Sequence, residues 1–261
     1  MKTIEGDVYA FPKYYDLVFG SDWKAEFDFL EDCFESHVPQ TVRRLYEPAC
    51  GTGRLMFRLG RAGYHVTGTD LNAAAVQYCN ARLRRHGVAG EAFVADMSEH
   101  LVHPQVDAAF NTINSFRHLQ TEQDAVAHLN CVANSLRVGG IYVLGLHLTP
   151  LVGQPSEQEA WSARKGNLCV NTHMWNTHRD LESRLERFDM TYDVYTPTKS
   201  FQLKGELILR TYTHGQINEL LQKTNTLELC ATYDFSYDIS KPHEVTDASE
   251  DVVYILQKCA E

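Results

Sequence analysis

The chain has 261 residues, 44% of them hydrophobic and 22% charged, which is typical of globular proteins and excludes a disordered chain. Its formal net charge is −10, and residues 1–40 and 216–261 each carry 9 acidic against 3 basic side chains. An acidic protein repels the phosphate backbone of nucleic acids, so DNA and RNA are excluded as first candidates for a partner. We expect a neutral or cationic small molecule instead.

Membrane, disulfide and metal classes find no support in the sequence. No apolar run reaches the roughly 20 residues that span a bilayer, and the first ten residues lack the apolar stretch of a secretory signal. The seven cysteines contain no Cys-x-x-Cys pair, and the pair His173 and His178 lacks a third ligand at suitable spacing. We therefore expect a soluble cytoplasmic protein with no membrane contact and no metal.

The first 150 residues alternate between amphipathic stretches and short apolar runs, which predicts a chain of helices and parallel strands. Residues 22–36 predict a helix, because Trp23, Phe27, Leu30 and Phe34 share one face. A strand over residues 44–47 runs into a glycine turn, and a helix through residue 61 follows. Later strands end at Asp70 and at Asp96 and begin at Asp107, with a helix over residues 72–86 between the first two.

The clearest predicted helix covers residues 121–137, and Thr121 with Asp124 resembles a capping box at its start. Gly139 and Gly140 are expected to end this helix and to lead into the apolar strand of residues 141–148. The sequence thus predicts an α/β fold with a doubly wound, mostly parallel sheet.

After Pro150 the pattern changes to segments rich in Thr, Tyr, Val and Phe, which favour strands. We expect an inserted antiparallel sheet of three strands at 167–177, 181–195 and 200–212. A helix capped by Thr213 and Gln216 and a final strand pair follow. This divides the chain into residues 1–40 (lid and first helix), 41–150 (core), 151–212 (insert) and 213–261 (last helix and strand pair).

The sharpest motif is Glu47-Pro-Ala-Cys-Gly51-Thr-Gly53, a glycine turn between a strand and a helix. Such a turn lets the backbone approach a ligand, although a tight turn without a ligand is the alternative. The dinucleotide fingerprint needs Gly or Ala where this chain has Met56, and the Gly-Lys-Ser/Thr of a phosphate-binding loop is absent. The acid Glu47 favours a zwitterionic cofactor over a pyrophosphate one.

Two further acids follow the turn at the ends of predicted strands. Asp70 can accept hydrogen bonds from a ribose diol, and Asp96 ends the next strand beside the place of a base. Each acid alone could be a solvated strand end. Together with the glycine turn they mark the carboxyl edge of the sheet, where ligands of parallel sheets bind.

The segments EPACGTGR, VTGTDLN, VADM, NTINSFRHL and LRVGGIYVLGLHL resemble successive motifs of the class I S-adenosylmethionine-dependent methyltransferases. The similarity covers about residues 43–148 and the terminal strand pair, and it implies a Rossmann-like sheet of seven strands. NTIN stands where the N-methyltransferases that modify DNA bases have an Asn-Pro-Pro-Tyr-like motif, which argues against a base-modifying enzyme. YYDLVF and the inserted sheet resemble, more loosely, the branch that methylates small amines.

The resemblance implies S-adenosylmethionine as cofactor and S-adenosylhomocysteine as product. It implies a methionine site at Glu47 and the glycine turn, a ribose site at Asp70, an adenine site at Leu71, Asp96 and Met97, and asparagines near the sulfonium. The expected cofactor residues are Glu47, Ala49, Gly51, Gly53, Arg54, Asp70, Leu71, Asp96, Met97, Asn111 and Asn114.

A lid is expected over the site, because methyl transfer depends on positioning and on the exclusion of water. Tyr14, Tyr15, Trp175 and Tyr212 are the expected substrate-binding residues, since aromatic faces suit a cationic amine. The alternative is that these rings pack the first helix and a small core. His147, at the end of the fifth strand, is the first candidate for a general base, and His118 is the second. A histidine bonded to backbone is the alternative for both.

The sequence therefore predicts a methyltransferase that acts on a small-molecule acceptor, at nitrogen before oxygen. Two alternatives stay open: a protein that binds the cofactor without catalysis, and a nicotinamide-dependent oxidoreductase, which Met56 and Glu47 disfavour. The acceptor and the oligomeric state are not predicted.

Overall fold

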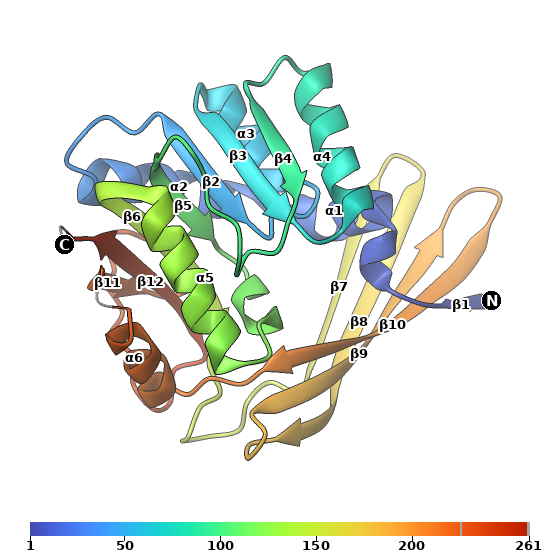
Figure 1. Ribbon diagram of the computed structural model, residues 1–261. Helices are drawn as coiled ribbons and strands as arrows, with labels where there is room; N and C mark the ends of the chain where they lie inside the picture. Colours follow the sequence, from blue (N-terminus) through green and yellow to red (C-terminus); the bar gives the residue numbers. More distant parts are fainter. Residues whose placement is uncertain (225, 260–261) are drawn as a thin grey trace.

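The computed structural model describes residues 1–224 and 226–259 and contains two β-sheets. The larger sheet has seven strands in the order β11-β12-β6-β5-β2-β3-β4, and the smaller has five in the order β1-β10-β9-β8-β7. Figure 1 shows the smaller sheet beside the larger one, toward the chain's N-terminus. Within the described ranges, no helix is both long and apolar enough to cross a membrane.

The seven-stranded sheet confirms the predicted α/β, mostly parallel fold. β2, β3, β4, β5 and β6 pair in parallel, whereas β12 is antiparallel to both β6 and β11. The strand bounds are β2 (Arg44–Pro48), β3 (His65–Asp70), β4 (Gly90–Val94), β5 (Val106–Asn111), β6 (Leu136–His147), β11 (Leu227–Tyr233) and β12 (Asp251–Lys258).

Helices cover both faces of this sheet and bury one apolar core on each. One core takes its helical residues from α2 (Lys24–His37), α3 (Arg54–Ala62) and α4 (Ala73–Arg85). The other takes them from α5 (Glu122–Ser135) and α6 (His214–Gln222). Burial of these stripes, at about 25 cal/mol per Å² of apolar surface, is what holds helices and sheet together.

Side chains at the starts of three helices satisfy backbone N–H groups that have no partner inside the helix. Asn72 accepts hydrogen bonds from the amides of Ala74 and Ala75 at the start of α4. Thr121 accepts one from the amide of Asp124 at the start of α5. The predicted cap of α6 is confirmed, since Thr213 and Gln216 form a reciprocal capping box.

The prediction that Gly139 and Gly140 end a helix was wrong. α5 ends at Ser135, β6 begins at Leu136, and both glycines lie inside that strand. Gly139 has a φ of 78°, and a Cβ on Gly140 would come within 2.8 Å of a carbonyl oxygen of β5. The two glycines therefore allow the backbone of β6 to follow an irregular path where its pairing register with β5 shifts.

The smaller sheet has five strands rather than the three predicted: β7 (Gln158–Lys165), β8 (Leu168–Asp180), β9 (Leu185–Tyr195), β10 (Ser200–Arg210) and β1 (Lys2–Glu5). β7 and β1 were missed because they are edge strands with mostly exposed side chains, so the apolar alternation of a half-buried strand is absent. β1 pairs in parallel with β10 and so brings the N-terminus to this sheet.

The two sheets are joined by a buried ion pair and by the first helix. Arg117, in the short helix η2 (Ser115–His118), pairs with Glu186 of β9 and donates Nε–H to the carbonyl of Arg210 at 2.7 Å. α1 (Pro12–Gly20) buries Leu17 and Val18 in the core of the smaller sheet. η1 (Val8–Ala10) adds Val8 to the same core, and these segments cover the carboxyl ends of the parallel strands.

Candidate functional site

Two adjoining pockets lie at the carboxyl ends of the parallel strands. The Glu47 pocket, of about 140 Å³, is lined by the ends of β2, β5 and β6 and by the smaller sheet. The Asp70 pocket, of about 210 Å³, is lined by the end of β3 and the start of α4. Both share a set of lining residues, namely Tyr9, Tyr15, Ala49, Ser115 and His118. The site is therefore one continuous region at the expected edge of the sheet.

The glycine turn forms the floor between the two pockets. Ala49, Gly51 and Gly53 all have left-handed backbone, with φ of 52°, 52° and 68°. A Cβ on Gly51 would stand 3.3 Å from the ring of Tyr15, so the bare backbone lets the lid ring approach the turn. Gly53 has a different role, because its Cβ would stand 2.3 Å from Cys79 Sγ. Gly53 permits α4 to pack and lines neither pocket.

Asp70 combines a structural role with an exposed edge in its pocket. Its Oδ2 accepts a hydrogen bond from the amide of Gly51 at 2.7 Å, and its Oδ1 accepts one from Asn72 at 2.8 Å. Burial raises the pKa of this carboxyl above its usual range, and the two amide hydrogen bonds oppose that shift. Each oxygen keeps a further lone pair for a ligand hydroxyl.

The other residues expected at an adenine divide between the pocket and its surroundings. Leu71 and Met97 line the Asp70 pocket, and Leu71 is 70% exposed, so it is free to cover a flat ring. Asp96 does not line either pocket. Its Oδ1 accepts hydrogen bonds from the amide and the hydroxyl of Ser98, at 2.8 and 2.7 Å.

Two buried acceptors in the Glu47 pocket have no hydrogen-bond partner in the described chain: Oε2 of Glu47 and Oδ1 of Asn111. Burial raises the pKa of Glu47 well above its usual range, while the charge of Arg54 acts in the opposite direction. Asn111 donates its Nδ2–H to the carbonyl of Pro48 at 3.1 Å, which fixes its amide. Because an unpaired buried acceptor costs about 1–3 kcal/mol, the pair marks a place for a donor.

Arg54 borders the Glu47 pocket, but its guanidinium is paired with a different carboxylate. Its guanidinium makes two hydrogen bonds to Glu26 of α2, at 2.7 and 2.6 Å. Glu26 also accepts a hydrogen bond from Thr112, which follows β5. This network fixes the start of α3 against α2 and supplies positive charge beside Glu47.

His147 lies at the end of β6 with a carboxylate behind it. Its Nδ1 is 2.5 Å from Oδ1 of Asp251, the residue opposite it on β12. Its backbone amide donates to Oδ1 of Asn114 at 3.1 Å, and the ring of Phe235 packs 5.1 Å away. His147 lines the Glu47 pocket, so Asp251 orients an imidazole whose other nitrogen is available to a ligand.

His118 borders both pockets and contacts the lid. Its Nε2 lies 3.4 Å from the hydroxyl of Tyr9, whose ring packs edge-on against Tyr15 at 5.4 Å. Burial lowers the pKa of His118, and the neighbouring charge of Arg117 lowers it further. This histidine is therefore held in the neutral form near pH 7.

Three of the four expected substrate residues lie outside the pockets. Tyr14 packs edge-on against Phe201 at 5.8 Å, on the smaller sheet. Trp175 packs against His173 on β8. Tyr212 is fully buried in the core beneath α5 and α6. Tyr14 thus has the packing role of the alternative, whereas Tyr212 belongs to the core of the larger sheet, and of the four only Tyr15 lines the two pockets.

Sequence reasoning missed the residues that the smaller sheet contributes to the Glu47 pocket. They are Glu159, Trp161, Met174, Met190, Leu207 and Leu209, from β7, β8, β9 and β10. Alternation along a strand shows which residues share a face, but it does not show that part of that face covers a pocket.

Comparisons with known proteins agree with this architecture. Residues 46–140 match the family described as "Methyltransferase domain". A Geobacillus sp. (strain WCH70) protein, provisionally named a methyltransferase, is 21% identical over 95% of this chain and 98% of its own length. An S-adenosylmethionine-dependent methyltransferase from Clostridium acetobutylicum shares the fold with a TM-score of 0.78 at 18% identity, covering 96% of this chain and 98% of that one.

Two further solved structures share the fold. A sugar N-methyltransferase from Streptoalloteichus sp. has a TM-score of 0.74 at 17% identity, covering 98% of this chain and 94% of that one. An amino pentose methyltransferase from Micromonospora echinaspora, solved with S-adenosylmethionine bound, has a TM-score of 0.71 at 19% identity, covering 97% and 99%. Residues 46–140 therefore resemble a methyltransferase domain, and the chain shares its fold with S-adenosylmethionine-dependent methyltransferases.

Proposed function

We propose that the chain binds S-adenosylmethionine across the Asp70 and Glu47 pockets and transfers its methyl group to a small-molecule acceptor, at nitrogen before oxygen. The observation that carries the proposal is the pair of unpartnered acceptors, Glu47 Oε2 and Asn111 Oδ1, beside a left-handed turn that ends a parallel strand. Solved neighbours of the same fold include a sugar N-methyltransferase and an amino pentose methyltransferase, which supports an amine acceptor.

The residues present suit each part of this cofactor. The unpartnered oxygens of Glu47 and Asn111 would accept hydrogen bonds from the ammonium of its methionine end. Asp70 accepts from the ribose diol while its amide contacts hold it in place, and Leu71 and Met97 flank the adenine. A pyrophosphate in place of the ammonium has no donor for the unpartnered Oδ1 of Asn111, whose amide is fixed by its hydrogen bond to Pro48, and this disfavours the nicotinamide alternative.

When bound, the cofactor supplies an electrophilic methyl on a sulfonium. The chain's part is to place a nucleophile opposite the methyl–sulfur bond and to exclude water, and such positioning is worth roughly 7–11 kcal/mol. Met174, Met190 and Leu209 form the apolar wall that excludes water on the acceptor side. The segment from β1 to α1 and the smaller sheet act together as the lid.

The acceptor nitrogen needs a group that removes its proton if it binds as an ammonium. His147, oriented by Asp251, takes this role, and His118 with Tyr9 is the second candidate. Glu159 also lines the Glu47 pocket and gives the acceptor side a carboxylate that suits a cation.

Product detection separates the enzyme from a protein that only binds the cofactor. The full-length chain is incubated with S-adenosylmethionine and panels of amines, phenols and carboxylates, and methylated products are identified by mass spectrometry. We expect product from the amine panel. Tight binding of S-adenosylhomocysteine with no product from any panel would favour the alternative of a protein that binds the cofactor without catalysis.

A further inference from the structure

A basic cleft of about 910 Å³ lies between α1, α3, α4 and the β7–β8 hairpin, and it shares one lining residue, Arg54, with the Glu47 pocket. Eight of the chain's 24 lysine and arginine side chains line this basic cleft, with Asp16 as the only acid among its lining residues. A chain of net charge −10 thus gathers a third of its cations around one recess. The volume falls in the range of small-molecule sites, roughly 300–1,000 Å³.

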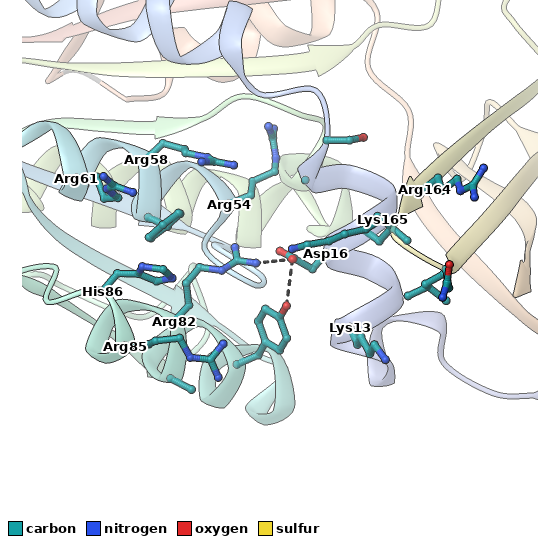
Figure 2. Close-up of a pocket in the computed structure, with 18 residues that line it drawn as sticks. Lys13, Asp16, Arg54, Arg58, Arg61, Arg82, Arg85, His86, Arg164 and Lys165 are labelled. Atoms are coloured by element: carbon teal, nitrogen blue, oxygen red, sulfur yellow. Dashed lines mark hydrogen bonds and ion pairs between the residues drawn. The ribbon is translucent and has the colours of Figure 1, made fainter. Parts of the chain in front are cut away.

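The cations come from opposite walls of the cleft. Figure 2 shows Arg58, Arg61, Arg82 and Arg85 of α3 and α4 on one side of Asp16, and Lys13, Arg164 and Lys165 on the other. Basic residues in the last turns of α3 and α4 complement the helix dipoles, which explains part of the first wall. That effect does not explain the second wall, which α1 and the end of β7 supply.

Few of these charges are neutralised. Asp16 pairs with Arg82 and accepts a hydrogen bond from Tyr78 at 3.1 Å, and Arg54 is paired with Glu26. Within residues 1–224 and 226–259, no ion pair involves the remaining cationic lining residues, namely Lys13, Arg58, Arg61, Arg85, Arg164 and Lys165. Like charges that face one another across a recess repel, so an anion bound between them is stabilised by both walls.

The lining also includes two aromatic rings, of which Tyr78 is half-buried and Phe57 is buried. Phe57 packs against His86 with ring centroids 4.7 Å apart, and the guanidinium of Arg82 lies over one face of Tyr78, 5.1 Å from the ring centroid. Guanidinium forks bind phosphate oxygens in pairs, and an aromatic face suits a base. We infer that the basic cleft binds a small molecule carrying a di- or triphosphate group, at a site separate from the methyl-transfer pockets.

A charged strand of nucleic acid is the competing occupant, and the structure favours the small molecule. The cations surround a recess instead of following a ridge, and the acidic ends of the chain repel a long polyanion. The test therefore includes both kinds of ligand.

Calorimetric titration of the full-length chain at low ionic strength tests the site with three probes: inorganic tripolyphosphate, a nucleoside triphosphate and a single-stranded oligonucleotide. We expect both small probes to bind and to weaken as salt is raised. If the nucleoside triphosphate binds more tightly than tripolyphosphate, the aromatic surface holds a base. If the two bind with equal affinity, the site recognises the phosphates alone. Absence of binding by both, or an oligonucleotide bound more than about tenfold tighter, would overturn the inference.

Variants of each wall locate the binding. Arg61→Ala with Arg85→Ala, and separately Arg164→Ala with Lys165→Ala, should each weaken tripolyphosphate binding about tenfold. Arg84→Ala is the matched control, because Arg84 is exposed beside Arg85 on α4 but does not line the cleft. Equal affinity of the wall variants and the control would refute the site. S-adenosylhomocysteine binding should be unchanged in all of them, so this test is independent of the proposed function.

Discussion

The carboxylate of Asp70 lies 2.7 Å from the backbone nitrogen of Gly51, so the acid at the end of β3 fixes the turn that follows β2. One side chain thereby connects the ribose position with the methionine position of the proposed cofactor. Its loss should disturb both ends of the site, which distinguishes Asp70 from an acid that only contacts a ligand.

Asp70→Asn should weaken S-adenosylhomocysteine binding at least about tenfold. In the wild type both carboxylate oxygens accept hydrogen bonds from backbone amides, and in the variant the Nδ2–H₂ group would face one of these amides and lose that hydrogen bond. Asp96→Asn should weaken binding less than about threefold, since Oδ1 of Asp96 already serves Ser98. Calorimetric dissociation constants for the two variants make the comparison. Equal losses would assign Asp96 a direct contact with the cofactor.

Glu47 should make cofactor binding release protons. Burial raises its pKa, so the free protein retains a proton on Glu47 as the pH rises above the ordinary range of a carboxyl. Stability from this group is present below the ordinary pKa and is lost as pH rises through the raised one. Beside a bound ammonium the charged form of Glu47 would be favoured, and the carboxyl would release its proton to solvent.

Titration with S-adenosylmethionine in buffers of different ionisation enthalpy measures this release. We expect up to about one proton per cofactor in the wild type and none in Glu47→Gln, together with weaker binding in the variant. Release that persists in Glu47→Gln would assign the proton to another group.

His147→Ala should lower kcat about 100-fold while changing cofactor affinity little, because His147 acts on the acceptor. Asp251→Asn should give a smaller loss of kcat, since Asp251 positions the imidazole through its Nδ1. Steady-state kinetics across pH separate this role from a structural one, because the general base controls the acidic limb of the kcat profile. Equal losses in kcat and in cofactor affinity would show that His147 is not the general base.

The buried pair of Arg117 and Glu186 should be worth more to stability than any exposed pair on the same strand. Arg117→Ala leaves a buried carboxylate with reduced compensation, and we expect a loss of about 3 kcal/mol in the free energy of unfolding. Arg187→Ala removes an exposed partner of Glu206 and should cost less than about 1 kcal/mol. Urea unfolding measures both, and equal losses would contradict the role of the pair as a tie between the sheets.

The core of the fold could be predicted because its signals are local. Apolar runs that end in Asp70 or in the glycine turn identify strands and their carboxyl ends, and parallel strands bring those ends to one edge. Gly139 and Gly140 were misread because a glycine pair ends a helix and accommodates a strand irregularity equally well, and only the pairing with β5 distinguishes the two.

The features that sequence reasoning missed depend on contacts between distant segments. Asp251 stands behind His147 across 104 residues of chain, and no local pattern connects them. The basic cleft joins Lys13, Arg61, Arg85 and Arg164, while the net charge of −10 disfavoured nucleic acid and favoured a neutral or cationic small molecule as ligand. A net charge describes the whole surface, and a binding site depends on the local arrangement of charges.

The most direct test of the central claim is a calorimetric titration of the wild-type chain with S-adenosylhomocysteine, with NADH as the competing ligand. We expect one saturable site for S-adenosylhomocysteine, weakened at least about tenfold by Asp70→Asn, and no site for NADH. Binding of NADH without binding of S-adenosylhomocysteine would contradict the proposed function.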